Sequence, residues 1–229
     1  MALIDYFSKK KLNKTLRFIF IPETIGSISY LSKKLEYLKK WVVGGYNLTC
    51  IGDERQHSCM FTKYGNTLAD ESLKAAYKKL RIKYKSYSFL KRGSDERQYN
   101  SPGIDLPIAS IFRTKYGEYK EYHTSEDNFN MVTTKGLSGG FKVAKNAINI
   151  LDKKIIPLNN IYCEPQMSKR GMYDTVSKKN NNKSFKIFLS FLQYSDGKND
   201  LEKISQYLKI NTSLTKKIYV NLVKRKLLR

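Results

Sequence analysis

The sequence predicts an α/β protein followed by a small all-helical domain. Short apolar runs of strand type alternate with longer runs whose apolar residues recur at helical spacing. Glycine, proline and aspartate separate these runs, as turns require. After a stretch of lysine and asparagine at residues 178–183, only helical spacing is left. We therefore predict a partial three-layer αβα domain (residues 1–151), an irregular connector (152–183) and a helical domain (184–229).

The N-terminal region is expected to hold one strand between two helices. Apolar spacing predicts helices over residues 2–12 and 28–40. Residues 16–21 (Leu-Arg-Phe-Ile-Phe-Ile) form a near-continuous apolar run, which is typical of a strand buried on both faces. Pro22 cannot donate to a central ladder, so we expect the chain to turn there.

The middle of the chain continues the alternation of strands and helices. This order predicts a mostly parallel sheet with helices on both of its faces. One of the strands alternates charged with apolar or aromatic residues, as an edge strand does. The expected elements are strands at residues 46–51, 83–90 (the edge strand) and 108–112, and helices at residues 68–80 and 136–151.

The C-terminal region resembles a winged-helix or helix-turn-helix module. Three short helices are expected there, at residues 184–193, 201–208 and 214–228. The third helix holds basic residues that could contact nucleic-acid phosphates. Two other interpretations stay open, because such a group is also typical of a solvated helix face or of a protein contact. These residues are Lys216, Lys217, Lys224 and Arg225.

The formal net charge of +23 allows two explanations. One is an anionic partner, with nucleic acid the first candidate. The other is a composition bias, because the chain is also rich in Asn, Ile and Tyr and has far more Lys than Arg. Lysine is less suited than arginine to bidentate phosphate recognition. Nucleic acid is therefore kept as a less favoured partner.

The cysteines and the apolar runs indicate a cytoplasmic protein without a membrane partner. The three cysteines, Cys50, Cys59 and Cys163, are an odd number without the spacing of a metal site, which fits reduced thiols. No apolar stretch approaches the roughly 20 residues of a membrane span. The first residues do not have the pattern of a signal peptide.

Polar residues at the ends of the predicted strands form the candidate site. Glu23 follows the first strand, Asp53 follows the second, Asp95 precedes the fourth, and His123 follows the fourth. The ends of successive parallel strands lie on one edge of a sheet, so these side chains can converge. Carboxylates and an imidazole suit zinc, which polarises water or a carbonyl. The alternative is structural, because acids cap helices and a single histidine is often a turn residue.

Five motifs carry a resemblance to a known family. The chain resembles bacterial aminopeptidase-like proteins that are associated with polysaccharide biosynthesis and carry a C-terminal winged helix. That family is similar to the zinc aminopeptidases and, more distantly, to the glutaminyl cyclases. The resemblance implies a zinc-exopeptidase-like sheet and hydrolysis of an amide bond in a peptide-like or small-molecule substrate. The motifs are residues 20–28, 93–99, 101–107, 122–128 and 164–173.

The resemblance also implies a role for each candidate residue. Glu23 matches the general base, His123 a metal ligand, and Asp53 a metal-binding or supporting carboxylate. Asp95 matches a residue that supports the site without binding the metal. Thr24 stands where the aminopeptidases have a metal-binding glutamate. The cofactor implied is one zinc ion.

The chain departs from the family's pattern in one important respect. The family supplies a further His and Asp from a segment ahead of the first helix, and this sequence has neither. The zinc site is therefore expected to be incomplete, and an apolar edge of the sheet to be uncovered. Three explanations are open: a truncated or split protein, an inactive remnant, or an edge covered by a partner chain or a second copy. The competing functions are an aminopeptidase-like hydrolase, a non-catalytic interaction protein and a nucleic-acid-binding winged helix.

Overall fold

The computed structural model describes residues 1–166, 169 and 181–229, with only the backbone of residues 181–184. The chain forms two compact units, Met1–Lys153 and Lys154–Arg229, and each is described by itself. The predicted linker at residues 178–183 and most of the motif at residues 164–173 lie outside the described residues.

The first unit is built on a four-stranded mixed sheet. The strands follow the order β1-β4-β2-β3 across the sheet. β1 pairs with β4 and β2 with β3 in parallel, whereas β2 and β4 are antiparallel. β1 therefore lies at one edge, with β4 as its only ladder partner among the described residues. The strands are β1 (Gly45–Leu48), β2 (Ser58–Met60), β3 (Lys85–Tyr87) and β4 (Ile108–Phe112).

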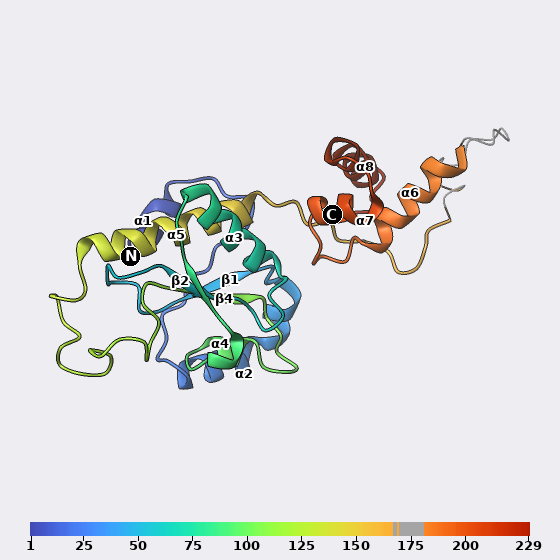
Figure 1. Ribbon diagram of the computed structural model, residues 1–229. Coiled ribbons are helices and arrows are strands. Elements are labelled where there is room, and N and C mark those ends of the chain that lie inside the picture. Colours follow the sequence, from blue (N-terminus) through green and yellow to red (C-terminus); the bar gives the residue numbers. More distant parts are fainter. Residues whose placement is uncertain (167–168, 170–180) are drawn as a thin grey trace. The chain divides into compact units, whose positions relative to one another are not determined.

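Helices cover both faces of this sheet, which gives three layers (Figure 1). One core joins α3 and α5 to the sheet and contains Leu73, Val143 and Ile111. A second core joins α2 to the other face through Leu31 and Leu38. The elements of this unit besides the strands are α1 (Ala2–Ser8), α2 (Ile25–Trp41), α3 (Leu68–Leu80), η1 (Phe89–Lys91), α4 (Glu96–Tyr99) and α5 (Thr134–Lys153).

Local chemistry explains why α3 and α5 begin where they do. Thr67 and Asp70 form a capping box, in which each side chain accepts a hydrogen bond from the other residue's backbone N–H. At the start of α5, the backbone N–H of Gly136 donates to Thr133 Oγ1 at 3.0 Å. A Cβ on Gly136 would lie 1.8 Å from the carbonyl oxygen of Gly52, so only glycine allows this close approach. α5 is thereby fixed against the residue that precedes Asp53.

Two local predictions were wrong. Residues 16–21 are not a strand, because none of the described strands pairs with them. Their side chains are half-buried or exposed, and Phe20 is 72% exposed. β2 was not among the predicted strands, because its three residues are too few to show an alternating pattern. β2 pairs antiparallel with β4, so the sheet is mixed, although the other two strand pairs are parallel as predicted.

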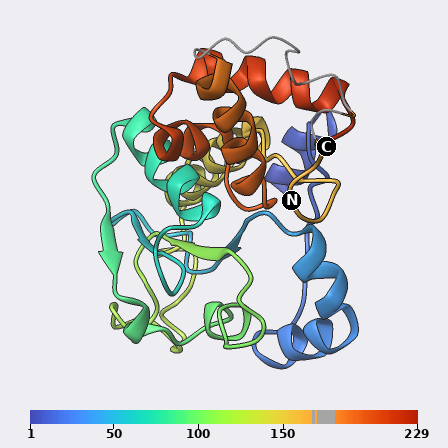
Figure 2. The ribbon, with the colours of Figure 1, turned by 90° about the vertical axis from the view of Figure 1, so that its right-hand side faces the viewer.

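The second unit contains three helices that pack together (Figure 2). They are α6 (Asn181–Gln193), α7 (Leu201–Leu208) and α8 (Thr212–Lys224). Asp200 and Asn211 cap α7 and α8 by accepting backbone N–H bonds. Isolated bridges join Leu158 to Asp196 and Asn159 to Leu228. The chain around residue 158 therefore belongs to this unit.

The prediction of an α/β sheet followed by a helical domain is confirmed. Among the residues that the structure describes, no helix has both the length and the apolar character needed to cross a membrane.

Candidate functional site

Asp53 is buried in the turn after β1, where it contacts the residues that follow β4. One of its carboxylate oxygens accepts hydrogen bonds from Arg55 N at 2.9 Å and Thr114 Oγ1 at 2.7 Å. The other oxygen accepts from Thr114 N at 2.7 Å. The carboxylate thus ties the turn after β1 to the residues after β4. Its bonds within the protein give it a structural role that needs no metal.

A bidentate ion pair connects the Asp53 turn to the loop that carries His123. Arg55 Nη1 and Nη2 donate to the two carboxylate oxygens of Glu121 at 2.9 and 2.7 Å. Arg55 lies two residues after Asp53, and Glu121 lies two residues before His123. The hydrogen bonds from Arg55 hold the pKa of Glu121 at about 2. The clamp brings the segments of two predicted ligands together.

His123 lies on the surface of this loop. Its backbone has a φ of 60°, in the left-handed region. Its imidazole stacks on the ring of Tyr122 with centroids 3.9 Å apart. The side chain is exposed and therefore open to a ligand from solvent.

Asp95 binds the start of α2 at the residue that follows Glu23. The backbone N–H of Thr24, the residue after Glu23, donates to Asp95 Oδ1 at 2.8 Å. Arg97 Nη2 donates to the hydroxyl of Thr24 at 2.7 Å. These bonds hold Thr24 at a φ of 61°, a region that branched residues rarely adopt. They fix the backbone from which the exposed Glu23 side chain extends.

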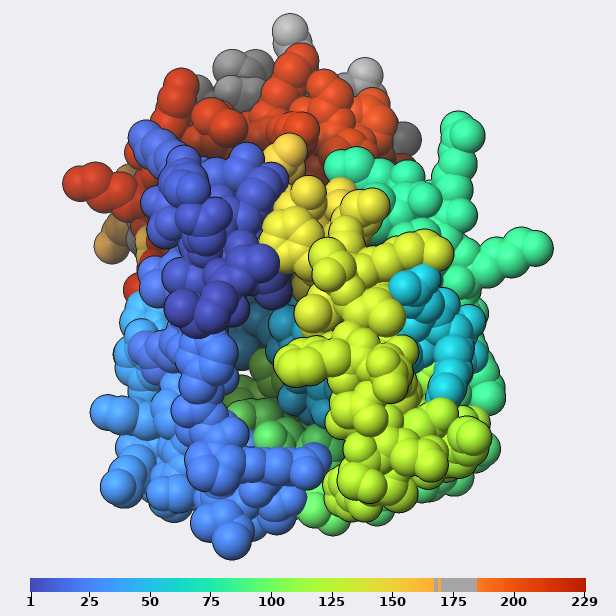
Figure 3. Space-filling model, turned by 90° about the vertical axis from the view of Figure 1, so that its left-hand side faces the viewer, coloured from blue at the N-terminus to red at the C-terminus, as the bar shows by residue number. Residues whose placement is uncertain are grey.

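The structure also brings Glu23 near the His123 loop. Burial raises the pKa of Tyr122, and the charges of Cys50 and Glu23 add to that rise. Figure 3 shows a hollow on this face, between the N-terminal residues in dark blue and the loop of residues 115–133 in yellow-green. Glu23 and the His123 loop thus lie within electrostatic reach of each other, whereas Asp53 is buried beneath its bonds to Thr114.

Sequence reasoning missed Glu96, which is the most buried carboxylate of this region. It accepts hydrogen bonds from Gly93 N at 2.8 Å, Ser94 N at 3.0 Å and the Tyr116 hydroxyl. Burial alone raises the pKa of Glu96, but the bonds from Tyr116 and the two amides outweigh it, so the pKa is lowered. The neighbouring Asp95 has the same charge, and the sequence holds no signal that separates the two.

His57 was likewise not predicted to belong to this region. Its Nε2 faces Nη1 of the buried Arg113, whose Nε donates to the carbonyl of Asp53 at 2.7 Å. Burial and the charge of Arg113 lower the pKa of His57 to about 4, against an opposing effect of Asp53. The imidazole is therefore neutral at pH 7 and accepts from Arg113.

The described residues do not by themselves fit a zinc ion. Residues 1–166, 169 and 181–229 contain no group of three or more His, Cys, Asp or Glu side chains that could hold a metal. Zinc sites in enzymes use three protein ligands and a water. The hydrogen bonds that occupy both oxygens of Asp53 further reduce the available donors.

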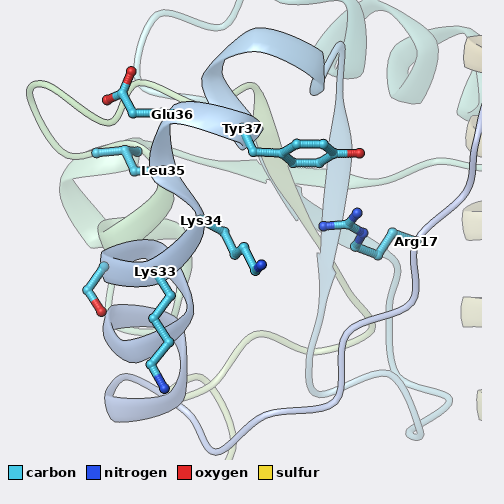
Figure 4. Close-up of a pocket in the computed structure, with 7 residues that line it drawn as sticks. Arg17, Lys33, Lys34, Leu35, Glu36 and Tyr37 are labelled. Carbon is cyan, nitrogen blue, oxygen red and sulfur yellow. The ribbon is translucent and has the colours of Figure 1, made fainter.

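A separate groove of about 580 Å³ lies between α2 and the chain before it (Figure 4). Arg17 extends across it toward Tyr37, with the guanidinium carbon 5.0 Å from the ring centroid. None of the predicted site residues lines this groove.

The basic residues predicted to contact nucleic acid are exposed on α8 and directly after it. Lys216, Lys217 and Lys224 lie on the helix surface, and Arg225 follows its last turn. Arg225 Nε donates to Asn221 Oδ1 at 2.9 Å. The second unit thus presents several cations on one element.

Solved structures similar to this chain include one protein from Clostridium acetobutylicum that is provisionally described as a peptidase. It is 33% identical with a TM-score of 0.65, and the match covers 100% of this chain and 51% of that one. A zinc aminopeptidase from Bacillus subtilis is 20% identical with a TM-score of 0.47, over 58% of this chain and 34% of that one. At this identity and TM-score, the similarity says nothing about the function of this chain.

A curated relative and two families also match. A Clostridium acetobutylicum protein, provisionally named for polysaccharide biosynthesis and an aminopeptidase-like domain, is 38% identical over 212 residues. That match covers 90% of this chain and 48% of the relative, so the chain spans about half the length of its relatives. Residues 155–229 match the winged helix-turn-helix family. Residues 2–154 match the family described as "Domain of unknown function (DUF4910)", and the chain therefore belongs to that family.

Proposed function

We propose that the protein contributes one part of the site of an aminopeptidase-like hydrolase, and that donors from outside the described residues complete this site. The observation that supports the proposal best is that Glu23 lies within electrostatic reach of Tyr122, the residue before His123. The names of the Clostridium acetobutylicum relatives support the reaction class. The proposed reaction is cleavage of an amide bond in a peptide-like substrate.

Glu23 is the residue of this chain that we propose for the proton transfer. A carboxylate open to solvent can take a proton from a water that attacks an amide carbonyl and return it to the leaving amine. The bond from the Thr24 amide to Asp95 and the bond from Arg97 to the Thr24 hydroxyl would orient the backbone next to Glu23. His123 is proposed to face the hollow of Figure 3, and Asp53, buried beneath its bonds to Thr114, is proposed to support the site.

Zinc content and amide hydrolysis of the isolated chain test the incomplete site. We expect well under one zinc per chain, and hydrolysis of leucine p-nitroanilide no faster than that of the Glu23→Gln variant. The result that would contradict the proposal is one zinc per chain that is lost in His123→Ala, together with hydrolysis that depends on Glu23. The isolated chain would then hold a complete site.

The full-length Clostridium acetobutylicum relative tests the proposed role of Glu23. Replacing its residue that aligns with Glu23 by Gln should lower kcat/KM for an amide substrate by at least about 100-fold at unchanged zinc content. Full activity of that variant would argue instead for the second candidate, a non-catalytic interaction protein. Polysaccharide biosynthesis, taken from the relative's name, and a cytoplasmic location belong to the proposal and do not affect either measurement.

A further inference from the structure

The open edge of β1 presents hydrogen-bonding groups that no described strand uses. The amides of Gly45 and Thr49 donate to the carbonyls of Pro107 and Ile111, on the β4 side. Amides of successive residues in a strand point in opposite directions. The N–H groups of Tyr46 and Leu48 therefore point away from β4, toward the open edge. Unpaired groups of this kind accept another strand.

The segment of residues 16–21 lies beyond this edge. In Figure 2 and Figure 4 it runs past the β1 side of the sheet, on its way from α1 to α2. It has the composition of a buried strand, yet Ile19 is 40% and Phe20 72% exposed. Ile25 and Ile28, 76% and 51% exposed, extend the apolar surface onto the first turn of α2. An apolar surface of this kind marks a contact site.

Hydrogen bonds hold this segment at its N-terminal side. The backbone amides of Asn13 and Lys14 both donate to Asp152 Oδ1 at 2.9 Å. Lys14 Nζ also donates to the carbonyl oxygen of Asp152 at 2.8 Å. The chain that enters the segment is thereby fixed to the end of α5.

The middle and the C-terminal side of the segment are held as well. Arg17 Nη1 donates to the Tyr30 hydroxyl of α2 at 2.8 Å. A Cβ on Gly26 would lie 2.8 Å from the Cβ of Ile21, so the start of α2 packs directly on the end of the segment. The exposed apolar residues are therefore presented by a positioned stretch of chain.

We propose that the β1 edge and the 16–21 segment together bind β-strands of a polypeptide segment that corresponds to the part of the relatives that this chain does not span. The relatives are about twice as long, and the matched solved structure places this fold within one longer chain. Strand addition supplies partners to the free amides and covers the apolar residues in one step.

Co-purification tests this proposal without any measurement of turnover. The full chain is co-expressed with a tagged protein made from the part of the Clostridium acetobutylicum relative outside the matched region, and the complex is analysed by size exclusion with light scattering. A 1:1 complex is expected. Phe20→Asp should weaken binding at least 10-fold, whereas Leu90→Asp, a matched change at an 84% exposed site, should leave it unchanged.

Hydrogen exchange and a proline variant locate the contact. The amides of Tyr46 and Leu48 should exchange at least 10-fold more slowly in the complex than in the chain alone. Leu48→Pro removes one outward N–H while leaving the amides that bond to β4, and should also weaken binding. If circular dichroism shows that Leu48→Pro is unfolded, the proposal is tested by Phe20→Asp and by the exchange rates of Tyr46 and Leu48.

Three results would overturn the proposal. The first is a folded chain that forms no complex. The second is a complex that Phe20→Asp and Leu90→Asp affect equally, or that leaves exchange at Tyr46 and Leu48 unchanged. The third is a dimer of the chain alone that Phe20→Asp dissociates, because the occupant of the edge would then be a second copy.

Discussion

At the scale of single residues, the protein separates groups that look alike in the sequence. Asp95 bonds to the backbone of Thr24, whereas the adjacent Glu96 is enclosed by Tyr116 and two amides. His57 is half-buried against Arg113, whereas His123 is exposed. No local pattern distinguishes the members of either pair, because burial depends on chain segments far away in the sequence.

His57 predicts how stability changes with pH. Its pKa is about 4 in the folded protein and about 6.5 when unfolded. Between these values the unfolded chain binds a proton that the folded chain does not. Stability is therefore fully present above pH 6.5 and falls as pH is lowered toward 4. Urea midpoints, read from the fluorescence of the single tryptophan, Trp41, should show this slope.

A pair of histidine variants isolates the effect. His57→Gln should flatten the slope between pH 6.5 and 4, whereas His123→Gln, at the only other histidine, should keep it. An unchanged slope in His57→Gln would show that other groups cause the pH dependence.

Gly136 predicts a large loss of stability on a small substitution. Because an added Cβ would lie 1.8 Å from the Gly52 carbonyl oxygen, Gly136→Ala must push α5 away from the turn before Asp53. We expect a loss of about 3 kcal/mol in the free energy of unfolding. Lys142→Ala, at an exposed position of the same helix, should change it by no more than about 0.5 kcal/mol. Urea unfolding of both variants, followed by Trp41 fluorescence, measures the two changes in the free energy of unfolding.

At the scale of elements, strong local signals were sufficient for some elements and not for others. α3 begins at its capping box, and β4 is an apolar run, so the sequence alone predicted both within a residue. β2 was not predicted, because three residues are too few to show the alternation of apolar and polar side chains that indicates a strand. Residues 16–21 have a strand's composition, but a strand also needs a ladder partner, and composition does not tell whether one is there.

The Arg55–Glu121 clamp predicts a local change in dynamics. Glu121→Gln removes the charge from the bidentate pair that holds the His123 loop. Amides of residues 115–133 should then exchange faster, while global stability falls by no more than about 1 kcal/mol because Arg55 is half exposed. Glu126→Gln, in the same loop, serves as the control. Equal exchange in both variants would show that the clamp does not order the loop.

At the scale of the whole molecule, the net charge of +23 allows a test of the nucleic-acid alternative. If α8 contacts phosphates, affinity for a labelled DNA duplex should fall steeply with salt. Replacing Lys216, Lys217 and Lys224 together by Gln should reduce the slope of log K against log salt by about 0.9 per lysine. The same triple change on the exposed Lys78, Lys79 and Lys83 should leave the slope unchanged. Equal effects would identify the binding as non-specific attraction to a basic surface.

The candidate site could be predicted only in part for a reason that belongs to the whole molecule. Asp53 and His123 follow β1 and β4, which pair in parallel, so the nearness of their segments could be expected from the order of elements. Glu23 was expected at the end of a strand over residues 16–21, and those residues form no strand. Whether three donors reach one ion depends on distances between separate segments. In the residues that the structure describes, no such group forms.

The bonds at the two ends of the 16–21 segment also affect the thermodynamics of any encounter there. Fixing the backbone of six residues costs roughly 6–12 kcal/mol of conformational entropy. Because Asp152, Asp95 and Tyr30 already restrain this stretch, that loss occurs when the protein folds. A polypeptide that docks here meets an ordered template, so the ordering of this segment adds little to the free-energy cost of binding.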